Sequence, residues 1–373
     1  MTTFRLPLSN PVTNSARHCR VAFFPCVEEM NANPYWPLLR SSLETRGVEF
    51  YSSTSGSFGR RWLWSRRGAV DVLHLHFIQQ FYAYEGAQAR LRWVLRFASS
   101  LILARALGYR TVFTLHDLVP MYPLRPAWVD YLGYWIAANF TERVIVHGEA
   151  ARQALASRYG RRRNVHVIEH PHYIGVYPNM VTREAARSCL GLKKDQIVFG
   201  FIGGIRPNKG IDQLVVSFGE IPGDNLRLVI AGKLWPPAEY SARLTSLIEK
   251  DDRIRFFPQF IPDEDIQLYL NAVDVVVLPF ASILTSGSTI MAMSFSRPVV
   301  APALGCLPEL INSKTGILYD PSDPEGLRNG MRSCLSRDLD AMGRAAYDSI
   351  KEASWEVAAE KTTAVYQAST ALS

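Results

Sequence analysis

Short apolar runs alternate along the chain with longer segments in which apolar residues recur every three or four positions. The short runs predict buried strands and the periodic segments predict amphipathic helices. In the first half, strands are predicted at 20–24, 48–51, 70–76, 111–115, 143–146 and 165–168, and helices at 35–45, 84–107, 128–139 and 149–159. Strands that alternate with helices indicate a parallel sheet with crossover helices.

The same rhythm restarts after 173–182, a stretch of glycine, proline, asparagine and threonine that is typical of a linker between domains. Strands are predicted at 197–202, 226–231, 254–256, 273–278 and 298–301, and helices at 210–219, 240–249, 263–271, 288–294 and 355–370. Two halves of this kind predict an α/β protein with two Rossmann-like domains that face each other across a cleft.

The composition is that of a globular protein, with 48% hydrophobic and 20% charged residues. Five scattered cysteines have no paired spacing, which argues against a disulfide framework or a zinc site and favours a reducing compartment. The first residues lack the pattern of a signal peptide, and no apolar stretch reaches the ~18 residues of a membrane span. We therefore expect the chain to stay on the cytoplasmic side.

Charge is unevenly distributed between the two halves. Residues 1–180 contain 21 arginines, no lysine and 11 acidic residues, a balance of +10, whereas the remainder carries 20 basic and 23 acidic residues, a balance of −3. This asymmetry predicts that the N-terminal half meets an anionic partner.

A glycine-rich turn follows the predicted strand at 197–202. Gly203 and Gly204 allow a ligand to approach the backbone, and Arg206 and Lys209 can form charge-assisted hydrogen bonds to phosphate oxygens. A turn of this kind serves tight packing about as often as phosphate binding, so the segment does not decide between the two interpretations.

A second turn, Thr285-Ser286-Gly287-Ser288, opens the helix predicted at 288–294. Free backbone N–H groups and the helix dipole favour an anion there, and the hydroxyl groups add donors. A serine that only caps the helix is the simpler interpretation. Two such turns in one domain, the first with an arginine and a lysine, favour a diphosphate site.

The C-terminal half resembles the family-4 glycosyltransferases and their GT-B relatives. The matching segments occur in family order at 201–212, 228–232, 272–279, 292–301, 307–310 and 315–321. The resemblance implies a GT-B fold with an acceptor-binding domain at 1–180, a nucleotide-sugar-binding domain at 190–352 and a C-terminal helix at 353–373 that packs back toward the N-terminal domain. It also assigns the donor diphosphate to Arg206 and Lys209.

The chain departs from the family pattern at two places. The family usually has an arginine at the position of Gly204, and Arg206 is its expected substitute. The family's paired glutamates correspond to Ile283 and Met291, whose side chains cannot usefully accept hydrogen bonds from a hydroxyl group. The turn at 285–288 looks like the variant of relatives that build bacterial exopolysaccharides. Recognition of the sugar and ribose is therefore assigned to backbone atoms or Glu309, and the stereochemistry stays open.

In the N-terminal half, the strand predicted at 111–115 ends in His116 and Asp117. Open α/β sheets bind ligands at the carboxyl ends of their strands, and the family commonly places a histidine near the transferred sugar at this position. If the reaction inverts the anomeric configuration, His116 or Asp117 is the expected general base. An aspartate that caps a turn beside a packed histidine explains the pair equally well.

Basic and aromatic residues gather in two segments of the N-terminal half. The segments contain Arg60, Arg61, Trp62, Trp64, Arg66 and Arg67, and then Arg92, Trp93 and Arg96. Arginines beside tryptophans suit an acceptor or an anionic membrane surface, and no recognition motif indicates nucleic acid. A solvated basic face without a specific role is the alternative.

These observations predict an enzyme that transfers a hexose from a nucleotide-diphosphate sugar to a lipid-linked oligosaccharide, in the synthesis of bacterial exopolysaccharide or cell-surface glycan. The resemblance alone favours GDP-mannose, with UDP-glucose or UDP-glucuronate next. No cofactor or metal is expected, and the Asp-x-Asp triplets at 263–265 and 338–340 are expected to cap helices. The enzyme is expected to act as a peripheral protein on the inner face of the cell membrane. A UDP-sugar epimerase, a phosphorylase and an inactive GT-B scaffold are the alternatives.

Overall fold

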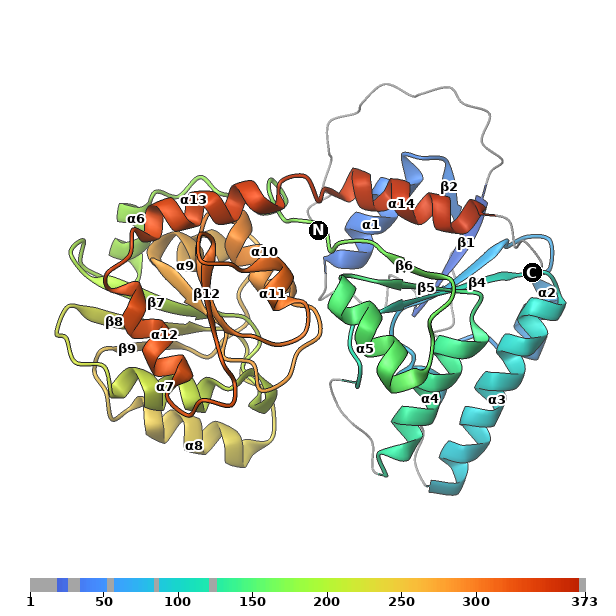
Figure 1. Ribbon diagram of the computed structural model, residues 1–373, viewed down its shortest axis with the longest axis horizontal. Helices are drawn as coiled ribbons and strands as arrows, with labels where there is room; N and C mark the ends of the chain where they lie inside the picture. The colour runs from blue at the N-terminus through green and yellow to red at the C-terminus, as the bar shows by residue number, and fades with distance from the viewer. Residues whose placement is uncertain (1–18, 26–33, 52–56, 84–86, 121–125, 369–373) are drawn as a thin grey trace. The chain divides into compact units, whose positions relative to one another are not determined.

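The computed structural model describes residues 19–25, 34–51, 57–83, 87–120 and 126–368. The chain divides into two compact units (Figure 1). The first unit holds the chain up to Val146, together with Leu155–Ile168 and the part from Trp355 onward. The second unit holds His147–Ala154 and Glu169–Ser354.

The first unit contains one sheet of six parallel strands in the order β2-β1-β3-β4-β5-β6. Its strands are β1 (Cys19–Phe24), β2 (Val48–Phe50), β3 (Val72–Leu75), β4 (Arg110–Leu115), β5 (Arg143–Val146) and β6 (Val165–Val167). Its helices include α1 (Tyr35–Glu44), α2 (Arg60–Ser65), α3 (Ala87–Ala106), α4 (Trp128–Phe140) and α14 (Trp355–Gln367), and α5 (Glu149–Tyr159) continues into it. The strand order reverses between β1 and β3, which is the point where open α/β sheets bind ligands.

The second unit repeats this architecture with the order β12-β11-β10-β7-β8-β9, and all its strand pairs are parallel. The strands are β7 (Ile197–Ile202), β8 (Leu226–Ala231), β9 (Ile254–Phe257), β10 (Val275–Val277), β11 (Val299–Pro302) and β12 (Gly316–Tyr319). The helices are α6 (Arg183–Cys189), α7 (Ile211–Gly219), α8 (Ala238–Ile248), α9 (Ile266–Ala272), α10 (Gly287–Ser294), α11 (Leu307–Leu310), α12 (Gly326–Cys334) and α13 (Leu339–Ile350). Here the strand order reverses between β7 and β10.

The structure confirms the predicted fold class, with two Rossmann-like units built on parallel sheets. Parallel strands are covered by helices on both faces, so they appear in the sequence as continuous apolar runs. Strand β10 is the clearest case, because Val275, Val276 and Val277 are all buried.

Of the two acidic triplets, Asp338 caps α13 by accepting a 2.9 Å hydrogen bond from the amide of Ala341, whereas the side chain of Asp265 makes no capping hydrogen bond to α9.

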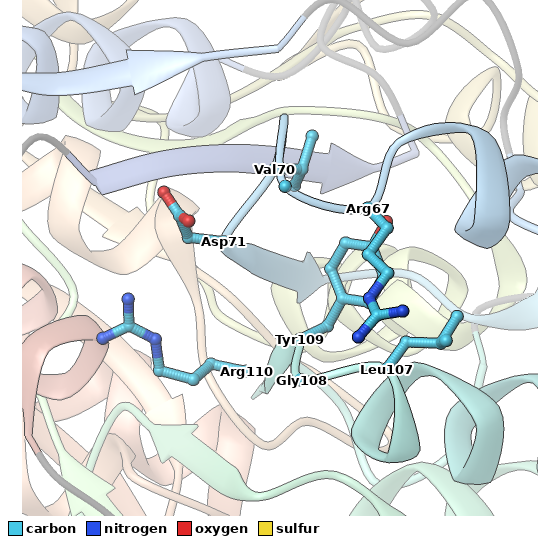
Figure 2. Close-up of a pocket in the computed structure, with 8 residues that line it drawn as sticks. Arg67, Val70, Asp71, Leu107, Gly108, Tyr109 and Arg110 are labelled. Carbon is cyan, nitrogen blue, oxygen red and sulfur yellow. The ribbon is translucent and has the colours of Figure 1, made fainter.

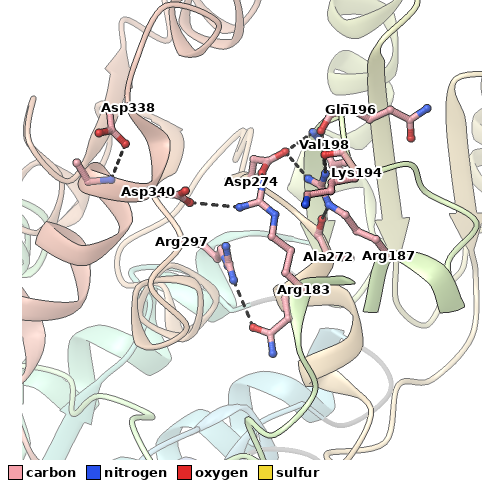
Figure 3. A network of polar contacts seen from close by, with 12 residues as sticks. Arg183, Arg187, Lys194, Gln196, Val198, Ala272, Asp274, Arg297, Asp338 and Asp340 are labelled. Atoms are coloured by element: carbon pink, nitrogen blue, oxygen red, sulfur yellow. Dashed lines mark hydrogen bonds and ion pairs between the residues drawn. The ribbon is translucent and has the colours of Figure 1, made fainter. Parts of the chain in front are cut away.

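Helix α6, which the sequence pattern did not predict, is fastened by a buried ion pair (Figure 3). Arg187 donates a 2.7 Å hydrogen bond to Asp274, which also accepts one of 2.7 Å from the amide of Val198. The same guanidinium group donates to the carbonyl oxygen of Ala272 at 3.0 Å. Arg187 and Asp274 are 3% and 6% exposed, so this aspartate within a family motif has a structural role.

Helix α14 returns the end of the chain to the first unit and packs against α1. The hydroxyl of the fully buried Tyr366 lies 2.6 Å from Nδ1 of His74 on β3. Arg143 on β5 donates 2.8 Å and 2.7 Å hydrogen bonds to the carbonyl oxygens of Val365 and Ala368. Helix α14 and the residue after it therefore supply hydrogen-bond partners for His74 and Arg143, two buried polar residues of the first sheet.

Candidate functional site

The two predicted anion-binding turns meet at the carboxyl edge of the second sheet. Gly203 follows β7 with a φ of +145°, and a Cβ atom added to it would lie 3.6 Å from Oγ of Ser288 at the start of α10. The amide of Ala281, in the segment after β10, donates a 3.2 Å hydrogen bond to the carbonyl oxygen of Asn208. Both turns therefore lie at the point where the strand order reverses, which is where ligands bind in this class of sheet.

Some of the glycines in these turns are required by packing within the protein. Gly210 has a φ of +67°, and a Cβ atom there would lie 2.0 Å from the carbonyl oxygen of Pro279. A Cβ atom on Gly232 would lie 1.8 Å from the carbonyl oxygen of Gly203. The packing explanation thus holds for Gly210 and Gly232, whereas a Cβ atom on Gly203 would make no contact shorter than the 3.6 Å to Oγ of Ser288.

Three cations lie over aromatic rings in the loops of this edge. Lys209 Nζ lies 4.5 Å from the ring centre of Phe280, and both Arg206 Cζ and Lys233 Nζ lie over the ring of Trp235, at 4.7 Å and 4.4 Å. A cation over an aromatic face is held by the negative potential of that face. The guanidinium also lies beside Gly204, because a Cβ atom there would be 3.5 Å from Nε and Nη2 of Arg206. The guanidinium of Arg206 therefore lies next to the space that a side chain at position 204 would fill.

The turn before α10 combines a helix cap with exposed donors. Ser286 is buried and caps the helix, since its Oγ accepts hydrogen bonds from the amide and hydroxyl of Thr289 at 3.1 Å and 3.0 Å. The simpler interpretation therefore holds for Ser286. Thr285, Gly287 and Ser288 are half-buried, so they border solvent at the end of the helix dipole that favours an anion.

His170 and Tyr173 lie against this turn. A Cβ atom on Gly287 would lie 3.3 Å from the hydroxyl of Tyr173 and 3.8 Å from Nε2 of His170. Burial, helped by the nearby charge of His147, lowers the pKa of His170 to about 3. Nδ1 lies 2.9 Å from the carbonyl oxygen of Pro171, which can only accept, so the neutral ring carries its proton on Nδ1 and leaves Nε2 as an acceptor.

Glu309, predicted as a sugar or ribose ligand, contacts backbone amides in the second unit. Its two carboxylate oxygens accept hydrogen bonds from the amide of Glu149 at 2.9 Å and from that of Ala150 at 2.6 Å. The carboxylate thus satisfies donors in the first turn of α5. Its role toward a ligand stays a prediction.

In the first unit, His116 pairs with a second histidine at the carboxyl edge of the sheet. Nε2 of His116, after β4, lies 3.1 Å from Nδ1 of His76, after β3. The half-buried His116 ring packs against the rings of Tyr35 and Phe77, with centroid separations of 5.0 Å in both cases. The pairing with His76 was not predicted, because the two residues are 40 positions apart.

His74 and His76 are buried. His74 bridges Tyr366 and Thr114, with Nε2 2.7 Å from the threonine hydroxyl. Among the described residues, no group of three or more histidines, cysteines or acidic residues is arranged to hold a metal ion. Asp117 is half-buried beside His116 in the chain, and its charge contributes to the raised pKa of Tyr134, which burial dominates.

The predicted basic and aromatic surface separates into two parts. A cavity of about 900 Å³ lies between α2 and α3 and is lined by Arg60, Arg61, Arg92, Trp93, Leu95, Arg96 and Ser99. Trp64, on α2, and Leu95, on α3, are each 58% exposed, so apolar side chains accompany the arginines. Trp62 instead packs on Phe24, with ring centroids 5.4 Å apart, and Arg66 lies over the ring of Tyr51 at 5.1 Å.

Arg67 lines a separate cavity of about 280 Å³ at the amino ends of β3 and β4 (Figure 2). Figure 2 shows Arg67, Asp71 and Arg110 around this space. Asp71 is already paired with Arg20 at 3.0 Å, and that pairing lowers its pKa although partial burial opposes the shift. This cavity lies at the sheet edge opposite to the histidine pair, so Arg67 is separate from the surface formed by α2 and α3.

Comparison with known proteins identifies the class. Residues 196–337 match the family model described as "Glycosyl transferases group 1". The chain is 28% identical to the D-inositol 3-phosphate glycosyltransferase of Mycolicibacterium smegmatis, over 91% of this chain and 76% of the relative. It is 27% identical to the GDP-mannose:glycolipid 4-beta-D-mannosyltransferase of Xanthomonas campestris pv. campestris, over 87% of this chain and 86% of the relative.

The fold is also that of a solved sucrose-phosphate synthase from Thermosynechococcus elongatus, with a TM-score of 0.73 at 18% identity, covering 94% of this chain and 98% of that one. Two parallel six-stranded sheets of this kind define a GT-B glycosyltransferase fold. Residues 196–337 thus match a group 1 glycosyltransferase domain, and the chain is a glycosyltransferase of the Leloir type. No helix within the described ranges is both long and apolar enough to span a membrane.

Proposed function

We propose that this enzyme transfers a hexose from a nucleotide-diphosphate sugar to a lipid-linked oligosaccharide, in the synthesis of bacterial exopolysaccharide or another cell-surface glycan. GDP-mannose is the favoured donor. The mannosyltransferase of Xanthomonas campestris supports this choice, because its name specifies GDP-mannose and a glycolipid, and the match spans most of both chains.

The observation that carries the proposal is the meeting of the two turns in the second unit. Gly203 borders Ser288, and Arg206 and Lys209 lie in the same loop, so N–H groups, hydroxyls and cations gather at one sheet edge. This combination suits the diphosphate of a donor. As the glycosidic bond breaks, negative charge grows on the nucleoside diphosphate, and fixed donors and cations stabilise that charge. In this proposal they do so without a metal.

The proposed chemical role of the first unit is deprotonation of the acceptor hydroxyl. His116 is the proposed general base, with Asp117 as the alternative, if the reaction inverts the anomeric configuration. The hydrogen bond to His76 supports the choice of His116, because it fixes the position of the imidazole ring.

The cavity between α2 and α3 is the proposed site of contact with an anionic membrane surface and the lipid-linked acceptor. Its arginines and the exposed Trp64 and Leu95 combine positive charge with apolar area, which suits a lipid headgroup region. The enzyme would then act as a peripheral protein on the inner face of the cell membrane. Sedimentation with vesicles of phosphatidylglycerol tests this, and an Arg92→Glu/Arg96→Glu variant should lose binding to them.

Thermal-shift titration of the full chain against GDP, UDP, ADP and their sugar conjugates tests the donor site. A ligand that binds only the folded state raises the melting temperature by mass action. We expect one nucleotide class to raise it, and Arg206→Ala and Lys209→Ala to remove the shift. A shift for UDP-sugars alone would replace GDP-mannose with UDP-glucose or UDP-glucuronate. No shift with any nucleotide would favour a catalytically inactive scaffold.

A further inference from the structure

The loop after β8 carries two residues, Lys233 and Trp235, that belong to no motif of the donor site. The indole of Trp235 is half-buried, and both the Arg206 guanidinium and the Lys233 ammonium lie over its ring. A cation over tryptophan is attracted by the negative face of the ring. The indole thus holds two positively charged groups close to its ring, Arg206 at 4.7 Å and Lys233 at 4.4 Å.

The backbone fixes Trp235 relative to Arg206. Beyond the ends of β7 and β8, Ile205 and Leu234 form a parallel bridge. The amide of Ile205 donates a 2.9 Å hydrogen bond to the carbonyl oxygen of Lys233, and the amide of Trp235 donates one of 3.0 Å to that of Ile205. Ile205 is fully buried, so the two loops are locked in register at the residue directly before Arg206.

The guanidinium that stacks on Trp235 lies beside Gly204. A Cβ atom on Gly204 would lie 3.5 Å from Nε and Nη2 of Arg206 and equally far from Nε1 of Trp235. The neighbouring Gly203 borders Ser288 of the second turn. The indole therefore holds the guanidinium beside Gly204, next to the place where the two turns meet.

An arginine loses side-chain entropy when it binds a phosphate, and a partner that orders it beforehand reduces that cost. We propose that Trp235 is a positioning residue of the donor site, which holds Arg206 toward the donor diphosphate, with Lys233 as a third cation of the site. This inference rests on the proposed function, since it assumes that a nucleoside diphosphate binds here.

A double-mutant cycle on nucleotide affinity tests the inference. Dissociation constants for GDP and UDP are measured by calorimetry on the full chain, with GMP and UMP as probes that lack the second phosphate. Trp235→Leu, which keeps apolar volume but loses the aromatic face, should weaken nucleoside diphosphate binding about 5- to 30-fold. Trp235→Phe should weaken it about 2-fold or less. Lys233→Ala should weaken it by a factor between these values.

Two features separate positioning from a structural role. In an Arg206→Ala background, Trp235→Leu should cause less than about 2-fold further loss, since the residues act through one interaction. Binding of the monophosphate should change much less than binding of the diphosphate. Trp128→Leu, an exposed tryptophan on α4, and Lys250→Ala, an exposed lysine, are matched controls that should leave the dissociation constants unchanged.

The outcomes distinguish this inference from the proposed function. If the wild-type chain binds neither GDP nor UDP, the donor site itself is refuted, and the inference with it. If the wild type binds and Arg206→Ala loses binding while Trp235→Leu does not, only the role of Trp235 is refuted. Equal losses for monophosphate and diphosphate, or full additivity with Arg206→Ala, would also overturn it, because the indole would then contact the base or merely support the fold. Trp235→Met, which also removes the aromatic face, replaces Trp235→Leu in the cycle if the leucine variant fails to fold.

Discussion

The carboxyl edges of the two sheets are built from different parts of the sequence. In the second unit, the edge is formed by contiguous turns, at 203–210 and 285–288, in which backbone groups and nearby cations lie close together. In the first unit, the edge is formed by single side chains from distant segments, with His76 after β3, His116 after β4, and Tyr366 of α14 supporting His74. A site made of turns leaves a motif in the sequence, whereas a site assembled from isolated side chains does not.

The proposed function places the chemistry in the first unit and donor binding in the second. His116→Ala should lower kcat by about 10²–10⁴-fold, because a positioned general base contributes that much. His76→Gln, which retains a hydrogen-bonding side chain beside His116, should lower kcat less. Steady-state kinetics of both variants measures the split between kcat and KM. A kcat unchanged in His116→Ala would transfer the role of base to Asp117.

The second unit depends on its buried ion pair. Arg187→Ala removes the more deeply buried of the two arginines that pair with Asp274, the other being Arg183, and we expect a loss of about 2–3 kcal/mol in the free energy of unfolding. The control Arg243→Ala breaks an exposed ion pair with Asp212 and should cost less than about 1 kcal/mol. Urea unfolding of the full chain compares the two variants. Equal losses would show that the network does not hold α6.

Two glycines with a similar positive φ, one in each unit, differ in how closely they are packed. Gly210→Ala combines a φ of +67° with a Cβ atom 2.0 Å from a carbonyl oxygen, and we expect a loss of about 3 kcal/mol. Gly47→Ala has a similar φ of +77° in open space, and it should cost about 1 kcal/mol. Melting temperatures of the two variants test this. A loss at Gly210 no larger than at Gly47 would mean that the turns of the second unit can separate without cost.

His170 predicts a pH dependence of the stability of the second unit. Its pKa falls to about 3 in the folded state, below the ordinary value of about 6.5 for the unfolded chain, so between these values only the unfolded chain binds the proton. The stabilisation is complete above pH 6.5 and is lost as the pH falls, by about 2 kcal/mol at pH 5. Denaturant unfolding at pH 7 and pH 5 measures it. His170→Gln should flatten the dependence, and an unchanged slope would contradict the shifted pKa.

The fold could be predicted from the sequence because strands covered on both faces are continuous apolar runs. Helix α6 was missed because Arg183–Cys189 is mostly polar and is held by the ion pair of Arg187. Strand β12 is short, at Gly316–Tyr319, and carried too little signal. The proximity of Gly203 to Ser288 could be expected, because both lie in motifs of one domain. The stacking of Arg206 and Lys233 on Trp235 could not be predicted, because it depends on the register between two loops.

The division of roles between the two units is tested most directly by measuring nucleotide affinity and turnover side by side in two variants. Calorimetry gives the dissociation constant for the nucleoside diphosphate. The rate at which the nucleoside diphosphate is released from the sugar nucleotide, in the presence of membrane lipid extract, gives turnover. We predict that Arg206→Ala weakens nucleotide binding and lowers turnover, whereas His116→Ala keeps the dissociation constant within about 2-fold and loses turnover. Loss of nucleotide binding in His116→Ala, or unchanged binding in Arg206→Ala, would contradict this division.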